Sequence, residues 1–330
     1  MLILTKENIQ SLFTMKDAIE AVKEAYQLQS SGQTEAPVRQ KLVGADPSNC
    51  FLFMPGSVET GQKAGIKIVS VFPSNMTSTR PVVSATMLLL DCHTGETLCL
   101  MEGSSLTQLR TAAATGVATD LLANRDATIA ALFGTGGQAE SQLEAMLTVR
   151  NLKEVRIYSR DQAKRQAFAL AMNTKFSESF NVRIIEATSS DEAILGAHII
   201  TCATSSNTPV FNGSLVQPGT HVNGVGSFTL TMQELDETLI SNCDKLYIDA
   251  FEACEEEAGD IMIPLSAGLF DRSRITGEIG DLLLGEIKGR QNANEITVFK
   301  SVGIAPQDTV TAERIFQAAL TRGIGQTITL

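Results

Sequence analysis

The sequence predicts an α/β protein in which a doubly wound parallel sheet follows a mixed α+β region. Three observations support this fold class. From residue 129 onward, short apolar runs alternate with helical patterns, as in parallel sheets whose strands are joined by helices. The first of these runs ends in the turn Gly134-Thr-Gly-Gly-Gln-Ala139, and a helical pattern comes next. The region before residue 119 shows strand and hairpin patterns instead.

In the N-terminal region, a helix is predicted over residues 14–31. Thr14 and Asp17 resemble a capping box at its start, and Gly32 ends it. Residues 73–81 are a polar loop, and a long helix is expected between Leu106 and Asn124. Strands are predicted at residues 38–43, 50–54, 64–72, 84–91 and 96–101, the last two forming a hairpin.

In the second region, the apolar runs predict strands at residues 129–133, 154–158, 182–185, 198–203, 221–225 and 245–249. A short strand near 296–300, a turn at Gly303 and a helix from about Thr309 to Arg322 follow. Because the parallel set is complete before residue 300, we expect the tail to return to the first domain. The predicted domains are residues 1–118 together with 300–330, and residues 119–299.

The composition argues against several classes of function. A net charge of −11 and the absence of Trp disfavour nucleic acid and anionic membranes as partners. No apolar run reaches the ~18 residues of a membrane-spanning helix, and the N-terminus lacks a signal-peptide pattern. Six cysteines without a C-x-x-C pair are typical of reduced thiols, so we expect a cytoplasmic protein. With three histidines and no metal-ligand spacing, no metal is expected.

The glycine-rich turn predicts binding of a dinucleotide. Gly134 permits a tight turn, Gly136 lets the backbone approach a pyrophosphate, and the small Ala139 lets the helix pack closely on the strand. A surface turn is the alternative, but the strand before and the helix after favour the nucleotide. The predicted cofactor contacts here are Gly134, Thr135, Gly136, Gly137 and Gln138.

The second strand indicates which nucleotide binds. An acidic residue at its end would accept a hydrogen bond from the ribose of NAD, but this chain has Ser159-Arg160 there. Arg160, with Lys164 and Arg165 behind it, would suit a 2′-phosphate. The alternative is that Arg160 is solvated and Asp161 caps the next helix. We favour NADP(H), with NAD(H) as the alternative.

Seven segments together resemble the ornithine cyclodeaminase/mu-crystallin family, in the family's order and over nearly the whole chain. They are Pro37-Val-Arg39, Gly65-Ile-Lys67, Gln108-Leu-Arg110-Thr111-Ala-Ala-Ala, Phe133-Gly-Thr-Gly-Gly-Gln-Ala139, Val155-Arg-Ile-Tyr-Ser-Arg160, His221-Val-Asn-Gly-Val-Gly226 and Phe299-Lys-Ser-Val-Gly303. The resemblance implies a Rossmann domain for a nicotinamide cofactor. It also implies that the other domain binds a small α-amino or α-imino acid and forms a homodimer.

The resemblance also implies roles for individual residues. Arg39, Lys67 and Arg110 match a cationic clamp for the substrate carboxylate, although a lone arginine would more often be a surface charge. Lys67 is either a general acid for the imine nitrogen or purely electrostatic. Lys67 and Arg110 are the predicted catalytic residues. Further cofactor contacts are expected at Thr111, Ser159, Arg160, Thr204, Val225, Gly226, Ser301 and Gly303.

One departure from the family pattern narrows the reaction. Ornithine cyclodeaminases have an acid/base Asp where this chain has Phe228, which would instead pack on the nicotinamide or on an apolar substrate ring. Glu234 and Asp236 are interpreted as charges at a helix start, and Asp308 as either a site carboxylate or an N-cap. This pattern favours NAD(P)H-dependent reduction of a cyclic imino acid, most simply Δ1-pyrroline-2-carboxylate to L-proline. Ornithine cyclodeamination, alanine dehydrogenation and non-catalytic NADPH or small-molecule binding remain as alternatives.

Overall fold

The computed structural model describes residues 1–329, so Leu330, the end of the predicted tail, lies outside the described residues. The chain divides into two compact units. Unit 1 contains Met1–Arg110 and the chain from Ile304 onward, and unit 2 contains Thr111–Gly303. The boundary that we expected at residue 118 falls inside helix α3 (Gly103–Leu122), whose contacts divide between Arg110 and Thr111.

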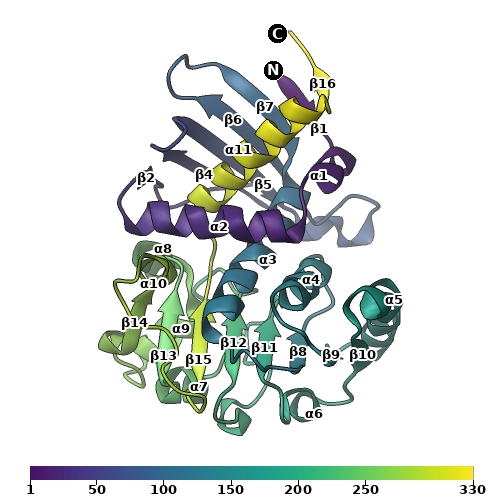
Figure 1. Ribbon diagram of the computed structural model, residues 1–330, viewed down its shortest axis with the longest axis vertical. Helices are drawn as coiled ribbons and strands as arrows, with labels where there is room; N and C mark the ends of the chain where they lie inside the picture. Colours follow the sequence, from purple (N-terminus) through teal and green to yellow (C-terminus); the bar gives the residue numbers. More distant parts are fainter. Residues whose placement is uncertain (330) are drawn as a thin grey trace. The chain divides into compact units, whose positions relative to one another are not determined.

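Unit 1 is built on one eight-stranded sheet with the order β16-β1-β7-β6-β5-β4-β2, in which β3 also pairs with β4. Long hydrogen-bonded ladders run antiparallel from β4 to β7, and β1 pairs in parallel with β7 (Figure 1). The one predicted hairpin, residues 84–91 with 96–101, is confirmed as β6 and β7. The strands are β1 (Leu2–Leu4), β2 (Thr34–Glu35), β3 (Gln40–Val43), β4 (Cys50–Val58), β5 (Lys63–Val71), β6 (Val83–Asp91), β7 (Thr97–Glu102) and β16 (Gln326–Thr327).

Helix α11 (Ala305–Arg322) packs on strands β4, β5 and β6 of this sheet. Helix α2 (Met15–Ser30) packs against α11, and α1 (Lys6–Leu12) precedes α2 in the chain. The capping box of α2 is confirmed, because the Thr14 hydroxyl accepts from the N–H of Asp17 and the Asp17 carboxylate accepts from the N–H of Thr14. Helix α11 begins at Ala305, earlier than predicted, with Pro306 in its first turn, where its missing N–H costs nothing.

The two faces of the unit 1 sheet differ in burial. Met54, Met87 and Leu89 are buried on the face that α11 covers. Because side chains alternate along a strand, their neighbours Phe53, Ile66, Ile68, Leu88 and Leu100 lie on the opposite face, where they are half-buried. Leu42 and Phe51 extend this apolar face at 57% and 37% exposure. We call these seven residues the outer sheet face.

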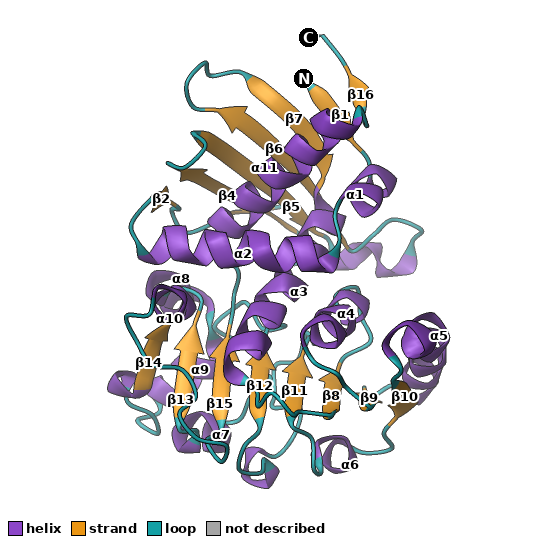
Figure 2. Ribbon diagram, in the orientation of Figure 1, coloured by secondary structure: helices purple, strands orange, loops and turns teal. Residues whose placement is uncertain are grey.

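Unit 2 contains a second eight-stranded sheet, in which every pairing is parallel (Figure 2). Its order is β10-β9-β8-β11-β12-β15-β13-β14, so the strand order reverses beside β8. The predicted doubly wound sheet is confirmed. The strands are β8 (Ile129–Phe133), β9 (Glu154–Tyr158), β10 (Arg183–Glu186), β11 (Ile199–Cys202), β12 (His221–Gly224), β13 (Lys245–Ile248), β14 (Ile275–Glu278) and β15 (Thr297–Lys300).

Helices cover both faces of the unit 2 sheet. Ala130 and Leu132 pack with α4 (Ala139–Val149) and α5 (Gln162–Phe180), whereas Ala131 and Phe133 face the other way. That second core includes residues of α6 (Ser190–Ile194), α7 (Glu237–Asn242), α8 (Phe251–Glu257) and α9 (Gly259–Ser266); the short α10 (Ile279–Leu284) follows β14. Successive residues of β8 thus point into two different cores, so the strand is covered on both faces, as is typical of a central parallel strand.

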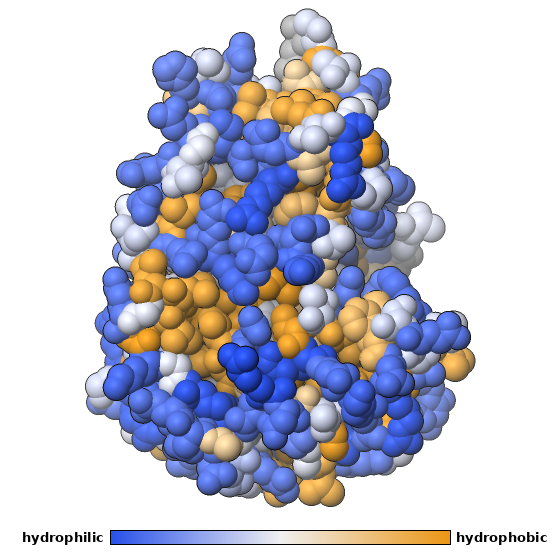
Figure 3. Space-filling view, viewed as in Figure 1, coloured by the Kyte–Doolittle hydropathy of each residue, from blue (hydrophilic) through white to orange (hydrophobic). Residues whose placement is uncertain are grey.

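The surface is mixed in character. In the space-filling view, hydrophilic residues cover most of the visible face of each unit, with smaller hydrophobic patches between them (Figure 3). Within residues 1–329, no helix has both the length and the apolar character needed to cross a membrane. The six cysteines are unpaired, and five of them are buried.

Candidate active site

Lys67 is the centre of a buried polar cluster in unit 1. Strand β5 places it on the same face as Val69, beneath α11, where only 1% of the residue is exposed. Its Nζ donates to both carboxylate oxygens of Asp308, at 2.9 and 2.8 Å. Asp308 lies in the first turn of α11, where the helix dipole favours a negative charge.

Arg110 joins the same cluster from α3. Its Nε donates to Asp308 Oδ1 at 3.0 Å, and a terminal nitrogen donates to Gln307 Oε1 at 2.9 Å. The Gln307 amide in turn donates to the Tyr26 hydroxyl of α2 at 2.7 Å. Residues from β5, α2, α3 and α11 are therefore held in one hydrogen-bonded chain.

The electrostatics of this cluster favour binding of an anion. Burial, the charge of Arg110 and, to a smaller extent, the charge of Arg39 lower the pKa of Lys67 to about 7, although Asp308 opposes the shift. Lys67 and Arg110 share the one carboxylate of Asp308, and the charge of Arg39 also acts on Lys67, so the cluster retains positive charge for a second carboxylate. The structure brings together the three predicted clamp residues, and their roles in binding and catalysis remain predictions.

Asp308 was left between two interpretations, and the N-cap interpretation is wrong. The N-cap of α11 is Ile304, and Asp308 is 1% exposed inside the helix. Asp308 was predicted only as one of these two alternatives, and Gln307 and Tyr26 were not predicted as site residues. A usable signal was present for Asp308, because two predicted buried cations require a carboxylate partner.

The glycine-rich turn of unit 2 has the geometry of a phosphate cradle. Gly134 has a φ of +107°, and a Cβ there would lie 2.5 Å from the carbonyl oxygen of Ala203. A Cβ at Gly136 would meet nothing within 4 Å, so the turn is open there. No side chain caps α4, and the buried Gln138 Oε1 has no hydrogen-bond partner. Free helix N–H groups beside an open glycine turn fit a pyrophosphate.

The end of β9 carries the predicted nucleotide-selecting residues. Thr135 Oγ1 and Ser159 Oγ lie 3.5 Å apart, and Arg160 is exposed. Asp161 does cap α5, accepting from the N–H of Lys164. Arg165 was expected to help bind a 2′-phosphate, but the structure places it elsewhere. It is buried, donates to Glu186 and to the carbonyl of Ser159, and lies over the Tyr158 ring. Of the three cations expected around a 2′-phosphate, Arg160 and Lys164 remain exposed.

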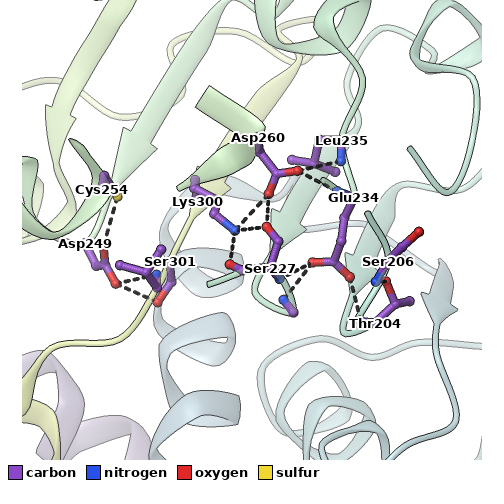
Figure 4. A network of polar contacts seen from close by, with 12 residues as sticks. Thr204, Ser206, Ser227, Glu234, Leu235, Asp249, Cys254, Asp260, Lys300 and Ser301 are labelled. Carbon is purple, nitrogen blue, oxygen red and sulfur yellow. Dashed lines mark hydrogen bonds and ion pairs between the residues drawn. The ribbon is translucent and has the colours of Figure 1, made fainter. Parts of the chain in front are cut away.

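The carboxyl ends of β11, β12, β13 and β15 carry a second polar network, shown in Figure 4. The Glu234 carboxylate accepts from the backbone N–H groups of Thr204, Gly226 and Ser227, at 2.5, 2.7 and 2.9 Å. Glu234 is therefore no helix-start charge as we expected. It is completely buried before α7, whereas Asp236 does cap that helix.

The tail residues Ser301 and Gly303 are fixed by Asp249 at the end of β13. The Asp249 carboxylate accepts from the Ser301 hydroxyl at 2.8 Å and from the N–H groups of Val302 and Gly303 at 2.8 and 2.7 Å. The Ser301 hydroxyl therefore donates its hydrogen bond to a protein carboxylate. Asp249 was not predicted as a site residue, because nothing local in the sequence connects it to residues 301–303.

The remaining predicted residues are placed as follows. Thr111 is the first residue of unit 2 and is 9% exposed. Val225 is buried at the end of β12, and the half-buried Phe228 follows in the loop. The structure therefore places the predicted cofactor residues within unit 2 and the three cations within unit 1. Among the described residues, no three His, Cys, Asp or Glu side chains are grouped to hold a metal ion.

A parallel sheet with a glycine-rich turn after its central strand defines a Rossmann-type α/β protein. The chain belongs to the ornithine cyclodeaminase/mu-crystallin family, whose model matches residues 1–323. The predicted resemblance is thus confirmed.

Several characterised relatives cover almost the entire chain. A Δ1-pyrroline-2-carboxylate reductase from Bacillus cereus is 39% identical over 328 residues, 99% of both chains. An alanine dehydrogenase from Archaeoglobus fulgidus is 31% identical over 99% of this chain and 98% of its own. The structure of Thermococcus litoralis Δ1-pyrroline-2-carboxylate reductase in complex with NADH and L-proline is 36% identical, with a TM-score of 0.94 over 99% of this chain and all of that one.

Proposed function

We propose that this chain is an NAD(P)H-dependent reductase of a cyclic imino acid, converting Δ1-pyrroline-2-carboxylate to L-proline. The observation that carries the proposal is the buried cluster of Lys67, Arg110 and Asp308, which has positive charge for a carboxylate and a lysine able to exchange a proton near neutral pH. The Bacillus cereus and Thermococcus litoralis relatives are named for this reaction.

The proposed reaction adds a hydride to the imine carbon and a proton to the imine nitrogen. When bound, the reduced nicotinamide supplies the hydride. Arg110 and Arg39 bind the substrate carboxylate and orient the C=N bond, since an arginine fork matches the geometry of a carboxylate. Lys67 holds the proton at Nζ and donates it to the nitrogen. Asp308 keeps Lys67 and Arg110 in place through its two oxygens.

Unit 2 provides the residues for the cofactor. The N–H groups at the start of α4 and the open turn at Gly136 would hold the pyrophosphate. Ser159, Arg160 and Lys164 would meet the adenosine ribose. Thr111, Thr204, Val225 and Gly226 would line the nicotinamide half, with Ser301 and Gly303 contributing through their backbone.

We propose that NADP(H) is preferred over NAD(H), because the exposed Arg160 lies at the end of β9 and the nearby Asp161 carboxylate is engaged by the N–H and the ammonium of Lys164. The Thermococcus litoralis relative was solved with NADH, so both cofactors need to be compared. The Arg160→Asp variant should lower kcat/KM with NADPH at least tenfold more than with NADH. An equal change with both cofactors would contradict this role for Arg160.

We also propose a homodimer that buries the outer sheet face of unit 1. This surface combines Phe53, Ile66, Ile68, Leu88 and Leu100 with the exposed Leu42 and Phe51, and a contiguous apolar face of this kind is typical of a subunit interface. A related archaeal alanine dehydrogenase, 30% identical with a TM-score of 0.90, was solved as a dimer with bound NAD.

The reaction is tested by NADPH and NADH oxidation with three substrates: Δ1-pyrroline-2-carboxylate, Δ1-piperideine-2-carboxylate, and pyruvate with ammonia. Turnover with the cyclic imines supports the proposal, and the ratio between them gives the preferred ring size. Turnover only with pyruvate and ammonia would identify an alanine dehydrogenase, which the Archaeoglobus fulgidus relative makes the second candidate. Cofactor binding without turnover, and without ammonia release from ornithine, would indicate a binding protein.

Phe228 is the observation against cyclodeamination. A phenyl ring cannot exchange a proton, and the nearby Glu234 is committed to three backbone N–H donors. The described part of unit 2 thus offers no substitute carboxylate from this loop. We expect no ammonia release from ornithine, which a coupled ammonia assay measures directly.

A further inference from the structure

We propose that Ser227, Glu234, Asp260 and Lys300 form a loop lock: a buried network that fixes residues 225–229 and so sets the position of Phe228 against the bound nicotinamide cofactor. The inference rests on the proposed function for the identity of that cofactor. It goes further by making four residues outside the ligand contacts responsible for the geometry of the loop. Figure 4 shows the loop lock from close by.

Lys300 is the cation of the loop lock. It lies at the end of β15, completely buried, and its Nζ donates to both the carbonyl oxygen and the hydroxyl of Ser227 at 2.6 Å. The same Nζ forms an ion pair with Asp260 Oδ2 at 2.8 Å. The Ser227 hydroxyl donates to that Asp260 oxygen. The backbone and side chain of Ser227 are therefore both held by charged partners.

The two carboxylates extend the loop lock to neighbouring elements. Asp260, from α9, also accepts from the N–H groups of Glu234 and Leu235, at 2.6 and 2.9 Å. Glu234 accepts from the N–H groups of Gly226 and Ser227 in the loop and from Thr204 after β11. The ends of β11, β12 and β15 are thus tied to α9 around one short loop.

Steric contacts restrict the loop at Gly226, the residue before Ser227. A Cβ at Gly226 would lie 2.3 Å from both the backbone N and O of Thr204, and 2.6 Å from Glu234 Oε1. The chain therefore passes between Thr204 and Glu234 with no space for a side chain. Phe228 comes directly after Ser227, so the loop lock ends one residue before the ring.

A nucleophilic role for this Ser–Lys pair does not fit the electrostatics. Burial lowers the pKa of Lys300, but the charges of Asp260 and Glu234 outweigh it, so the pKa lies above its usual value. A lysine that stays charged cannot take the proton of a serine hydroxyl. Lys300 is consequently a hydrogen-bond donor that holds the loop, and it does not act as a base.

Stability alone does not account for the loop lock either. Buried ion pairs are often no more stabilising than apolar residues of similar size, because removing each charge from water is expensive. What such a network does supply is directional hydrogen bonds, and here they converge on the backbone of residues 226 and 227. A displacement of about 1 Å near a reacting centre can lower a rate on the order of a hundredfold.

The test is a double-mutant cycle of Ser227→Ala and Phe228→Ala. Ser227→Ala removes the hydroxyl but leaves the Lys300–Asp260 ion pair in place. The matched control is Thr220→Val, which removes another buried hydroxyl, bonded to the Ala197 carbonyl, at the opposite end of β12. Each protein is measured for the Kd of NADH and NADPH by nucleotide fluorescence, for kcat and KM with the cyclic imine, and for Tm.

We expect Ser227→Ala to weaken cofactor binding and lower kcat/KM about tenfold or more, and to do so much less in the Phe228→Ala background, because coupled residues are non-additive. Thr220→Val should change Tm without changing Kd. Equal losses from Ser227→Ala in both backgrounds, or an equal loss in Thr220→Val, would overturn the loop lock. If the wild type reduces no imine, the proposed function fails, while the Kd cycle still decides the inference.

Discussion

The proton-donor role of Lys67 predicts how the reaction depends on pH. A general acid must carry its proton in the free enzyme, so kcat/KM should follow the protonated fraction of Lys67. With the pKa lowered to about 7 by burial and Arg110, that fraction is about one half at pH 7, about a tenth at pH 8 and about a hundredth at pH 9. Imine reduction should therefore slow about tenfold per pH unit above pH 8.

The assay is NADPH oxidation at low concentrations of Δ1-pyrroline-2-carboxylate between pH 6 and 9.5. The imine itself also titrates, so the profile of the wild type alone does not identify Lys67. Asp308→Asn provides the comparison. It removes the charge that raises the pKa of Lys67, and the alkaline fall should then move to lower pH by about one unit or more.

Ionisation of the substrate contributes equally to both profiles, so the difference between them reports on the protein. Identical midpoints in the wild type and Asp308→Asn would refute the role of Lys67 as the acid. A wild-type profile that is flat from pH 7 to 9 would refute it as well. In that case Lys67 would act through its charge alone.

Three further predictions concern assembly and stability. Ile66→Asp, on the outer sheet face, should convert the proposed dimer to the 35.3 kDa monomer in sedimentation; an unchanged mass would exclude this interface. Gly134→Ala should weaken NADPH binding and lower the free energy of unfolding by ~2 kcal/mol, because a Cβ would strike Ala203 at a φ of +107°. Arg150→Met should lower it by ~3 kcal/mol in urea titrations, because Arg150 donates to the carbonyls of Thr119, Asp120, Ala123 and Asn124 near the end of α3. The control is Arg183→Met at an exposed position, which should lower the free energy of unfolding by under ~1 kcal/mol.

Local patterns in the sequence were sufficient for the parallel sheet. Strands β8 and β9 match the predicted ranges residue for residue. Strand β8 is an apolar run, and β9 alternates charged residues with the apolar Val155 and Ile157. The glycine-rich turn could also be predicted from local sequence, because its pattern lies directly between a strand and a helix. Strand β14 was missed: its sequence, Ile-Thr-Gly-Glu, is short, half-polar and interrupted by a glycine.

Non-local pairings were not readable from such patterns. The proximity of Lys67 and Arg110 was inferred from the family resemblance, because 43 residues separate them and no local periodicity connects them. Asp308 reaches Lys67 across 241 positions of sequence. The loop lock joins residues 227, 234, 260 and 300, whose charges look like ordinary surface charges until the fold buries them.

The order of the strands has a consequence for synthesis of the chain on the ribosome. Strand β15, which ends at Lys300, lies between β12 and β13, so the sheet of unit 2 has a gap until nearly all of the chain has emerged. Unit 1 waits even longer, because α11 and β16 close it. Unit 1 therefore cannot be completed until all of unit 2 has been translated. Until β15 has emerged, the nascent chain leaves apolar strands of this sheet unpaired, and unpaired strand edges of this kind are prone to aggregation.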